Sequence, residues 1–505
     1  MVAAKSIPQN HHETPAQREM RILAEQQAKH ISDAIDEQLR VERAELKKNK
    51  PDVKILLLGQ SESGKSTTLK QFQLLHTPAA FQAERMAWRI VIYLNLVRSV
   101  RRVLDTISAE REEEISELSD TASLLSDGQT AVSSVSTDPE TRRIAAEKYA
   151  EYSTALAPVL ELEARLIRNL REDDDEDEAT RLGDGSAPGW SVPRGEYAVR
   201  TTSNWKRALT LGRSRSKRKS ASVSVPWWED PSDPVHTLES CRNSMNRLWK
   251  DEWVRRRLVE KRVRLQESSG FYLDEIERIT AKMYAPTDED VLKARLKTVG
   301  VVEHSFTINM GSIRGNSNWV IYDVGGSRSQ RHAWAPFFQD VNAIIFLAPI
   351  SAFDQVLTEV RARPSRLYLS ATALIPNCLV SQDSRVNRLE DSLLLWRAVV
   401  SNKLLEKVPI VLFLNKCDLL REKIEAGVQL KNHLLTYGDR PNEYEPVSKY
   451  LRNKFGLLHN QNSSNRDREL FIHFTAVIDK AKTAQIITSV REAILRINLK
   501  TLKLM

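Results

Sequence analysis

A glycine-rich segment that follows a short apolar run constrains this 505-residue chain more than any other feature. Val53 to Leu58 is apolar and leads into Gly59, which is the pattern of a buried strand that enters a loop. The loop reads Gly59-Gln-Ser-Glu-Ser-Gly64-Lys65-Ser66 and precedes a helical pattern. Strand, GxxxxGK[ST] loop and helix in this order predict a phosphate-binding loop, in which Lys65 reaches the β and γ phosphates and Ser66 ligates Mg²⁺. A glycine-rich turn that matches by chance is the alternative.

Short apolar runs recur after this loop, separated by helical patterns. The runs that we expect to be strands are Val53 to Leu58, Val301 to Ile308, Trp319 to Asp323, Ala343 to Leu347, Val408 to Leu414 and Phe471 to Thr475. Strands that alternate with helices predict an α/β domain with a mostly parallel sheet. Residues 81–290 show helical periodicity instead, as in Ile90 and Leu94, and predict an inserted all-helical domain.

These patterns predict the organisation of the chain. We expect an exposed N-terminal helix in 1–50, the first part of the phosphate-binding domain in 51–80, the insertion in 81–290 and the remainder in 291–505. Two polar tracts inside the insertion, at about 106–140 and 172–234, hold too few apolar residues to bury and are expected to be disordered.

A second motif indicates which base a bound nucleotide carries. Asn415-Lys416-Cys417-Asp418 directly follows an apolar run. A carboxylate such as Asp418 can accept both N–H donors on the edge of guanine, and leaving it unpaired opposite adenine costs on the order of 1–3 kcal/mol. After a phosphate-binding loop, this motif predicts a guanine nucleotide. A surface turn is the alternative for these four residues, and a general P-loop ATPase is the alternative for the chain.

A third motif concerns the γ-phosphate. Asp323-Val-Gly325-Gly326 ends a predicted strand, so Asp323 can hold Mg²⁺ through water while the N–H of Gly326 meets the γ-phosphate. Taken alone, the motif is equally compatible with a tight turn. The basic stretch before it, which contains Arg295 and Thr298, is by itself compatible with solvated surface.

Three segments in this order carry a resemblance to a known family. They read Tyr272-Leu-Asp-Glu-Ile-Glu-Arg-Ile279, Tyr284-Ala-Pro-Thr-Asp-Glu-Asp-Val-Leu-Lys-Ala-Arg-Leu-Lys-Thr298 and Asp323-Val-Gly-Gly326. Together with the helical insertion they resemble the switch region of heterotrimeric G-protein α subunits, which join a Ras-like P-loop GTPase domain to an inserted helical domain. The similarity covers roughly Ala24 to Asn95 and Met245 to the C-terminus.

The resemblance implies a role for individual residues. Arg295 would be the arginine supplied to the γ-phosphate, and Glu62 the loop carboxylate that meets it. Ser66, Thr298 and Asp323 would hold Mg²⁺. The residues expected to contact GTP or GDP are Glu62, Ser63, Gly64, Lys65, Ser66, Thr67, Ser268, Leu292, Lys293, Arg295, Thr298, Asp323, Gly326, Asn415, Lys416, Asp418 and Val477.

The chain departs from the family pattern at two positions that concern hydrolysis. Ser327 stands where the family has the glutamine that orients the attacking water, and serine is too short for that role. Ser61 stands before Glu62 where glycine is usual. With a catalytic set of Arg295, Ser327 and Glu62, we predict slow intrinsic GTP hydrolysis, because water positioning and charge stabilisation dominate phosphoryl transfer.

The resemblance also implies partners. The N-terminal helix resembles the one that docks the G-protein βγ dimer, and the helix from Ala484 to Leu504 resembles the one that reads a G protein-coupled receptor; an ordinary packed helix is the alternative for both. The chain has no stretch of ~20 apolar residues, and its N-terminus offers no acceptor for a lipid. We therefore expect a cytoplasmic protein that reaches the cytoplasmic face of the plasma membrane through its partners.

Three further features lie outside these motifs. The scattered Cys241, Cys378 and Cys417 are expected to be free thiols. The net charge of +8 and the basic run Arg213 to Lys219 permit an anionic partner, but a phosphorylatable loop is favoured and no nucleic acid is expected. Residues Val360 to Gln382 interrupt the family pattern and are either a retained intron in the gene model or a surface loop.

The function that we expect is a GTP/GDP switch that relays receptor signals to an effector that the sequence does not identify. A GTP-binding adaptor with negligible turnover is the alternative from a different class of protein.

Overall fold

The computed structural model describes residues 28–37, 40, 52–108, 139–171, 198–199, 226–261, 263–298, 300–309, 316–357, 386–476 and 478–501. The chain divides into two units, Met1–Asp52 with Asn309–Asn318, and Val53–Ile308 with Trp319–Met505. In the first unit, residues 28–37 are helical and exposed, including the apolar Ile31 and Ile35. The predicted exposed helix is confirmed for this described part.

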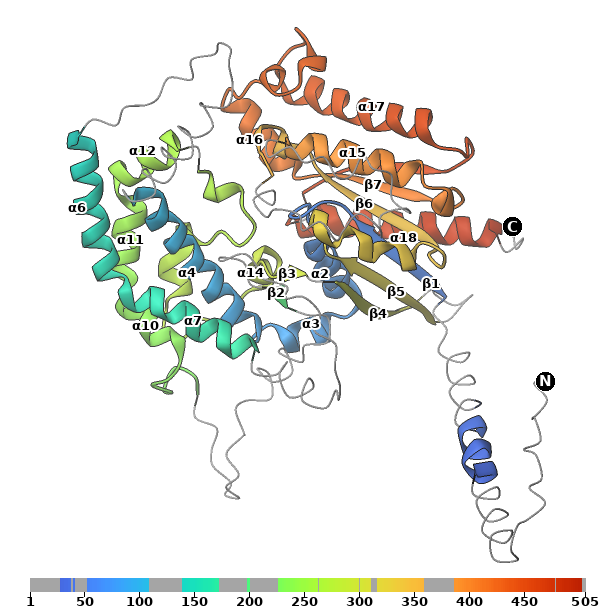
Figure 1. Ribbon diagram of the computed structural model, residues 1–505, viewed down its shortest axis with the longest axis horizontal. Helices are drawn as coiled ribbons and strands as arrows, with labels where there is room; N and C mark the ends of the chain where they lie inside the picture. Colours follow the sequence, from blue (N-terminus) through green and yellow to red (C-terminus); the bar gives the residue numbers. More distant parts are fainter. Residues whose placement is uncertain are drawn as a thin grey trace, which may run out of the picture. The chain divides into compact units, whose positions relative to one another are not determined.

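A six-stranded sheet forms the centre of the second unit (Figure 1). In spatial order its strands are β4 (Val301–Asn309), β5 (Asn316–Val324), β1 (Val53–Leu58), β6 (Ala343–Pro349), β7 (Ile410–Asn415) and β8 (Leu470–Thr475). All pairs from β5 to β8 are parallel, whereas the six residues between β4 and β5 are too few for a parallel crossover. Each predicted strand is confirmed, with ends that differ by up to three residues.

Parallel pairing brings the ends of the strands to one edge of the sheet. Leu57 pairs with Asp323, and Asn415 pairs with both Pro349 and Thr475. The loops that follow β1, β5 and β7 therefore meet at the carboxyl edge, which is where ligands bind in open α/β sheets. All three sequence motifs lie at the carboxyl ends of these strands or directly after them.

Helices cover both faces of the sheet. On one face, α15 (Arg388–Val400), α16 (Cys417–Glu425) and α17 (Tyr444–Asn462) share a core with strand residues such as Leu56 and Phe346. Neither α2 (Lys65–His76) nor α18 (Lys480–Thr501) contributes to that core; α18 contacts α2 and β8 instead. Successive strand residues point to opposite faces, so the near-continuous apolar strands are explained by burial on both sides.

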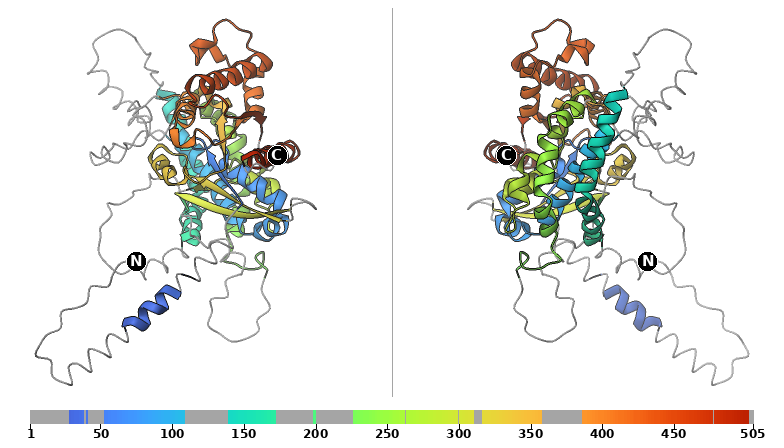
Figure 2. Two further views of the ribbon diagram at one scale, coloured as in Figure 1. Left: turned by 90° about the vertical axis from the view of Figure 1, so that its right-hand side faces the viewer. Right: turned by 90° about the vertical axis from the view of Figure 1, so that its left-hand side faces the viewer.

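A second core lies among the helices of the insertion. These are α4 (Trp88–Ile107), α6 (Pro139–Ala155), α7 (Ala157–Arg171), α10 (Pro234–Ser240), α11 (Arg242–Lys250) and α12 (Glu252–Glu260). Helix α4 is buried on nearly all sides rather than along the single predicted stripe, because α6, α7 and α12 all contact it. Figure 2 shows these blue, teal and green helices gathered in one group.

Short elements connect these parts. They are α3 (Pro78–Glu84), η1 (Leu265–Glu267), η2 (Leu273–Glu275), α13 (Ile276–Ile279), α14 (Asp288–Lys293), β3 (Lys297–Thr298), η3 (Arg328–Phe337), η4 (Ile350–Asp354), η8 (Lys403–Leu405), η9 (Leu430–Asn432) and η10 (Leu435–Tyr437). No helix of the described residues is long and apolar enough to span a membrane. Cys241 and Cys417 are free thiols, as expected.

The structure corrects part of the expected disorder. Within the tract predicted at 172–234, β2 (Ala198–Val199) pairs in parallel with β3, and residues 226–234 form hydrogen-bonded turns that lead into α10. Backbone pairing with a neighbouring strand does not require an apolar sequence, which is why composition missed it. The rest of that tract, the basic run at 213–219 and the insertion at 360–382 lie outside the described residues.

Candidate functional site

The predicted phosphate-binding loop joins β1 to the N-terminus of α2. Two glycines have backbone angles that favour glycine, with φ of 143° at Gly59 and 104° at Gly64. A Cβ at Gly59 would also collide with the carbonyl oxygen of Leu347. The buried ammonium group of Lys65 donates to the carbonyl oxygens of Gly59 and Gln60, at 2.9 and 2.8 Å. The loop thus encloses the cation that would face a phosphate.

Three oxygen-bearing side chains meet at this loop, from α2, β3 and β5. Ser66 Oγ donates to Asp323 Oδ2 at 2.6 Å, and Thr298 Oγ1 donates to the same oxygen at 3.4 Å. Burial raises the pKa of Asp323, and the nearby Lys65 acts in the opposite direction. Among the described residues, Asp323 Oδ1 has no hydrogen-bond partner although it is buried. One oxygen of this carboxylate is therefore available to a cation.

The donor set suits Mg²⁺ that is shared with a nucleotide. Proteins typically hold Mg²⁺ through one or two carboxylates together with water and phosphate oxygens. The described part of the chain contains no group of three or more His, Cys, Asp or Glu side chains that could hold a metal ion. One carboxylate with two hydroxyls fits a site that phosphate oxygens complete.

The turn after β5 approaches the phosphate-binding loop closely. A Cβ at Gly326 would collide with Lys65 Nζ and with the carbonyl group of Gln60, so only glycine fits. The preceding residue, Gly325, is fixed because the indole N–H of Trp334 donates to its carbonyl oxygen at 3.0 Å. The backbone N–H of Gly326 is therefore well placed for a phosphate that Lys65 holds.

Two helices hold the backbone around Arg295. Asn95 in α4 accepts from the Arg295 N–H at 2.7 Å and donates to its carbonyl oxygen at 2.9 Å. Lys70 in α2 donates to the carbonyl oxygens of Val291 and Ala294, at 2.8 and 2.7 Å. Sequence reasoning missed Asn95 and Lys70 because neither stands in a recognisable motif.

Glu62 faces two guanidinium groups. It forms ion pairs with Arg295 and, at 3.1 Å, with Arg388, which also donates to the carbonyl oxygen of Ser61 at 2.7 Å. Burial alone would raise the pKa of Glu62. The two arginines and Lys416 outweigh burial and lower that pKa to about 2. Glu62 is therefore ionised at neutral pH and holds both cations.

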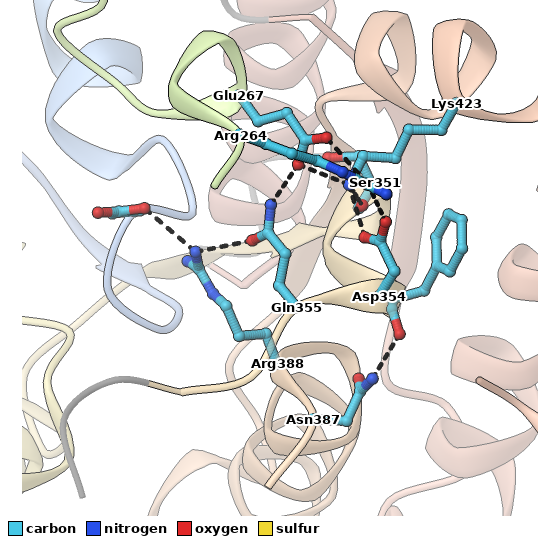
Figure 3. Close-up of polar contacts among 10 residues, drawn as sticks. Arg264, Glu267, Ser351, Asp354, Gln355, Asn387, Arg388 and Lys423 are labelled. Carbon is cyan, nitrogen blue, oxygen red and sulfur yellow. Dashed lines mark hydrogen bonds and ion pairs between the residues drawn. The ribbon is translucent and has the colours of Figure 1, made fainter. Parts of the chain in front are cut away.

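A network of polar contacts leads from Arg388 to the segment after α12 (Figure 3). Gln355 accepts from Arg388 at 3.0 Å and donates to Glu267 at 2.6 Å. Lys423 in α16 is buried and pairs with Glu267 at 2.7 Å and with Asp354 at 2.6 Å. This network attaches the connection between the inserted helices and the switch segments to α15 and α16.

The base-recognition motif begins at the carboxyl end of β7. Asn415 is fully buried, donates to the carbonyl oxygen of Ser63 at 2.7 Å and accepts from Thr475 Oγ1 at 3.0 Å. Its carboxamide therefore ties the phosphate-binding loop to β8. This residue positions the loop, and its predicted contact with the nucleotide stays a prediction.

The other residues of the motif differ in exposure. Lys416 has a left-handed backbone with φ of 62°, and burial lowers its pKa to about 8 although Glu62 acts in the opposite direction. Asp418 is exposed in the first turn of α16, where its carboxylate is open to a ligand. Val477 lies outside the described residues, so its predicted contact stays a prediction.

One pocket collects many of the predicted residues. Those that line it are Glu62, Ser63, Gly64, Lys65, Ser66, Thr67, Arg295, Thr298, Gly326 and Ser327. On the side of the insertion, Ser269 and Ala294 line the pocket, and the predicted Ser268, Leu292 and Lys293 are not among its described lining residues. Their nucleotide contacts stay a prediction.

Comparison with known proteins identifies the family. A family model described as G-protein alpha subunit matches residues 29–494. The chain belongs to the G-protein alpha subunit family. The alpha-4 subunit of Mycosarcoma maydis is 33% identical over 571 aligned residues, which cover 97% of this chain and 93% of that protein. The alpha-1 subunit of Saccharomyces cerevisiae is 26% identical, with 94% and 95% covered.

In this alpha subunit, ion pairs with α15 hold the segment that follows Gly326. Arg331 forms a buried ion pair with Asp391 at 2.5 Å, and Arg328 joins the same carboxylate at 3.0 Å. Together they hold the pKa of Asp391 below its usual value despite burial. Ser327 begins this segment, and its Oγ lies 3.4 Å from Ser329 Oγ. Ser327, the residue that we predict cannot orient the attacking water, is thus buried in a segment that ion pairs hold in place.

Arg388 is a residue of the candidate site that sequence reasoning did not assign. A signal was present, because Arg388 ends the stretch Asp383-Ser-Arg-Val-Asn-Arg388 that resembles the family. Its charge gave no indication of a partner, since Lys and Arg together account for 75 residues of the chain. Only the fold brings it to Glu62.

Proposed function

We propose that this alpha subunit is a switch that binds GTP and GDP and hydrolyses GTP. The observation that supports this best is the convergence of Lys65, Arg295 and the Ser66–Thr298–Asp323 group on one pocket. Relatives are described as guanine nucleotide-binding proteins, which agrees with the exposed Asp418 in the first turn of α16. Lys65 and the backbone of the loop bind the phosphates, and Arg295 leaves Glu62 to meet the γ-phosphate.

Magnesium is the cofactor of this proposal. Ser66, Thr298 and Asp323 would hold it, and when bound it neutralises charge on the phosphates. The unpartnered Asp323 Oδ1 and the absence of any carboxylate cluster among the described residues support a site that needs phosphate to be complete.

Hydrolysis is proposed to be slow. Ser327 is short and has Ser329 beside its hydroxyl, so it does not reach an attacking water. Ser61 adds a side chain to the lining of the pocket where the family has glycine. Arg295 can still stabilise transition-state charge, so turnover is reduced rather than abolished. A GTP-binding adaptor with negligible turnover is the second candidate function, favoured by the same Ser327.

The partners follow from family membership. We infer docking of a βγ dimer on the exposed helix at 28–37 and of a receptor on α18, whose Ile487 and Val490 are buried while Gln485 and Ser489 are exposed. Attachment at the cytoplasmic face of the plasma membrane would then come through these partners. The effector is not identified.

Two measurements on the purified chain test the proposal. Binding of GTPγS, GDP and ATPγS is compared by calorimetry in Mg²⁺, and we expect the guanine nucleotides to bind at least about 100-fold more tightly. Single-turnover hydrolysis of GTP then separates a slow switch from an adaptor without turnover. Equal affinity for adenine and guanine nucleotides would exclude the proposed function.

A further inference from the structure

One carboxamide in the nucleotide pocket has no role in the proposed function. Gln330 lies in η3, three residues after Ser327, and its N–H donates to the Ser327 carbonyl oxygen at 3.0 Å. In a 3₁₀ turn, residues three apart lie on the same side. The side chain of Gln330 therefore lies on the same side of this turn as Ser327.

The side chain of Gln330 is buried and lines the pocket. The residue is 8% exposed, and its Oε1 atom has no hydrogen-bond partner among the described residues. An unsatisfied buried carbonyl oxygen costs about 1–3 kcal/mol, so it calls for a ligand or water. The pocket that Gln330 lines also contains Arg295, Thr298 and Gly326.

Gln330 lies directly against the backbone that is placed to meet the γ-phosphate. A Cβ at Gly325 would overlap its Oε1 atom, so the carboxamide lies against the Cα of Gly325, next to Gly326. That backbone does not move freely, because the Gly325 N–H donates to the carbonyl oxygen of Gly300 at 2.9 Å. The carboxamide is thus next to the γ-phosphate end of the pocket, on a fixed support.

Other side chains do not offer this group. Gln60 turns its Nε2 away from the pocket, to the carbonyl oxygen of Arg388 and to Ser392 Oγ, at 2.9 and 2.7 Å. Among the described residues that line the pocket, Gln330 is the one carboxamide. A carboxamide can accept from water through its oxygen and donate to a phosphate through its nitrogen, which serine cannot do together.

We propose that Gln330 orients the attacking water in this chain and so supplies the group that position 327 lacks. The inference rests on the proposed GTPase function. Gln330 Oε1 accepts a hydrogen bond from water, whose oxygen forms a bond to the γ-phosphorus while the bond to the β–γ bridging oxygen breaks. The bridging oxygen keeps the electron pair and leaves with GDP, and the water proton passes to an oxygen of the phosphate produced.

Replacement of the carboxamide by an apolar group of similar size tests this. Gln330→Leu and Gln330→Met are compared with the wild type and with Gln82→Leu, a glutamine exposed on α3. We expect both Gln330 variants to hydrolyse GTP at least about tenfold more slowly in single turnover, because orientation of the nucleophile is lost. Gln82→Leu should match the wild type.

Two binding measurements separate this role from a structural one. GTPγS and GDP should bind both Gln330 variants within about twofold of the wild type, since orientation of water contributes to the transition state and not to ground-state binding. Aluminium fluoride, a mimic of the transferring phosphoryl group, should bind the GDP complex of these variants at least about tenfold more weakly.

Two results would overturn the proposal. One is hydrolysis at the wild-type rate in both Gln330 variants. The other is a parallel loss of GTPγS affinity and hydrolysis, which would make Gln330 a support for the Gly325 backbone only. Failure of the proposed function has a different signature, because the wild-type chain itself would then not bind GTPγS.

Discussion

The carboxylate of Glu62 is shared between Arg295 and Arg388, one guanidinium at each of its oxygens. Arg388 is further anchored by Ser61 and Gln355, whereas the Arg295 side chain is 27% exposed. Arg295 can therefore turn toward a phosphate while Arg388 keeps Glu62 in place. The pair would keep the arginine that is proposed to act in hydrolysis close to the site.

Stability should depend on the charge of Glu62. Its pKa falls from 4.5 to about 2 on folding, which corresponds to on the order of 3 kcal/mol at neutral pH. A lowered carboxyl pKa gives stabilisation that is complete above pH 4.5 and lost as the pH falls toward 2. Urea unfolding should show Glu62→Gln less stable than the wild type at pH 7, with the difference shrinking below pH 4.5. Glu422→Gln, exposed on α16, is the control. A constant difference across this range would contradict the prediction.

Asp323 should show the opposite sign. Burial raises its pKa, so the ionised carboxylate costs stability at neutral pH. This cost shrinks as the pH falls through the raised pKa toward 3.8, and it is absent below 3.8. Asp323→Asn should therefore leave the nucleotide-free protein as stable at pH 7, or more stable, by thermal unfolding. The same variant should lose the slowing of GTPγS dissociation by Mg²⁺. Asp340→Asn, at an exposed aspartate, should retain it. An Mg²⁺ effect that persists in Asp323→Asn would exclude Asp323 as a ligand.

Removal of Lys423 should accelerate nucleotide release. Its ammonium group lies between Glu267 and Asp354, so Lys423→Met leaves both carboxylates with Arg264 as their remaining cation. The cost should lie below the roughly 3–5 kcal/mol of a buried charge without any partner. If only 1.4 kcal/mol of this cost destabilises the GDP-bound state relative to the transition state for release, GDP dissociates about tenfold faster. Stopped-flow release of a fluorescent GDP analogue measures it.

The double variant provides the check on Lys423. Glu267→Gln combined with Lys423→Met removes one of the two carboxylates that have lost the Lys423 cation, so it should release GDP more slowly than Lys423→Met alone. Additive effects of the two substitutions would show that the contact of 2.7 Å does not couple the segment after α12 to α16.

Asp418 should control the choice of base. Asparagine in its place has one acceptor oxygen and a donor that would face the donors of guanine, so Asp418→Asn should lose about ten- to 100-fold in GDP affinity. Calorimetry with GDP and ADP measures the preference. Asp439→Asn serves as the matched control, because that aspartate is exposed and lies outside the motif. Retention of full GDP affinity in Asp418→Asn would place base recognition elsewhere.

The strands were predictable because local sequence suffices to specify them. Six apolar runs bounded by glycine and polar residues correspond to β1 and β4–β8, since a strand buried on both faces must be apolar throughout. The two-residue strand β2 was not predictable, because backbone pairing with Lys297–Thr298 leaves no pattern in the local sequence. The burial of α4 on nearly all sides could not be predicted either, since it depends on which other helices pack against α4.

Much of the candidate site was predictable for a related reason. Lys65, Ser66, Asp323 and Gly326 stand in motifs where the chemistry depends on backbone turns that adjacent residues specify. Asn95, Arg388 and Gln330 were missed because their partners are brought to them by other segments. No pattern around such residues distinguishes them from ordinary helix or surface positions.

The sequence by itself determined that this chain has a phosphate-binding loop, a guanine motif and a helical insertion in a mostly parallel α/β fold, because each is written in contiguous residues. Only the tertiary structure decided that Glu62 holds two arginines, that Asp323 keeps one oxygen unpartnered and that Gln330 faces the pocket. The physical reason is that charge pairing and burial depend on distances between atoms, and folding sets those distances for residues far apart in the chain.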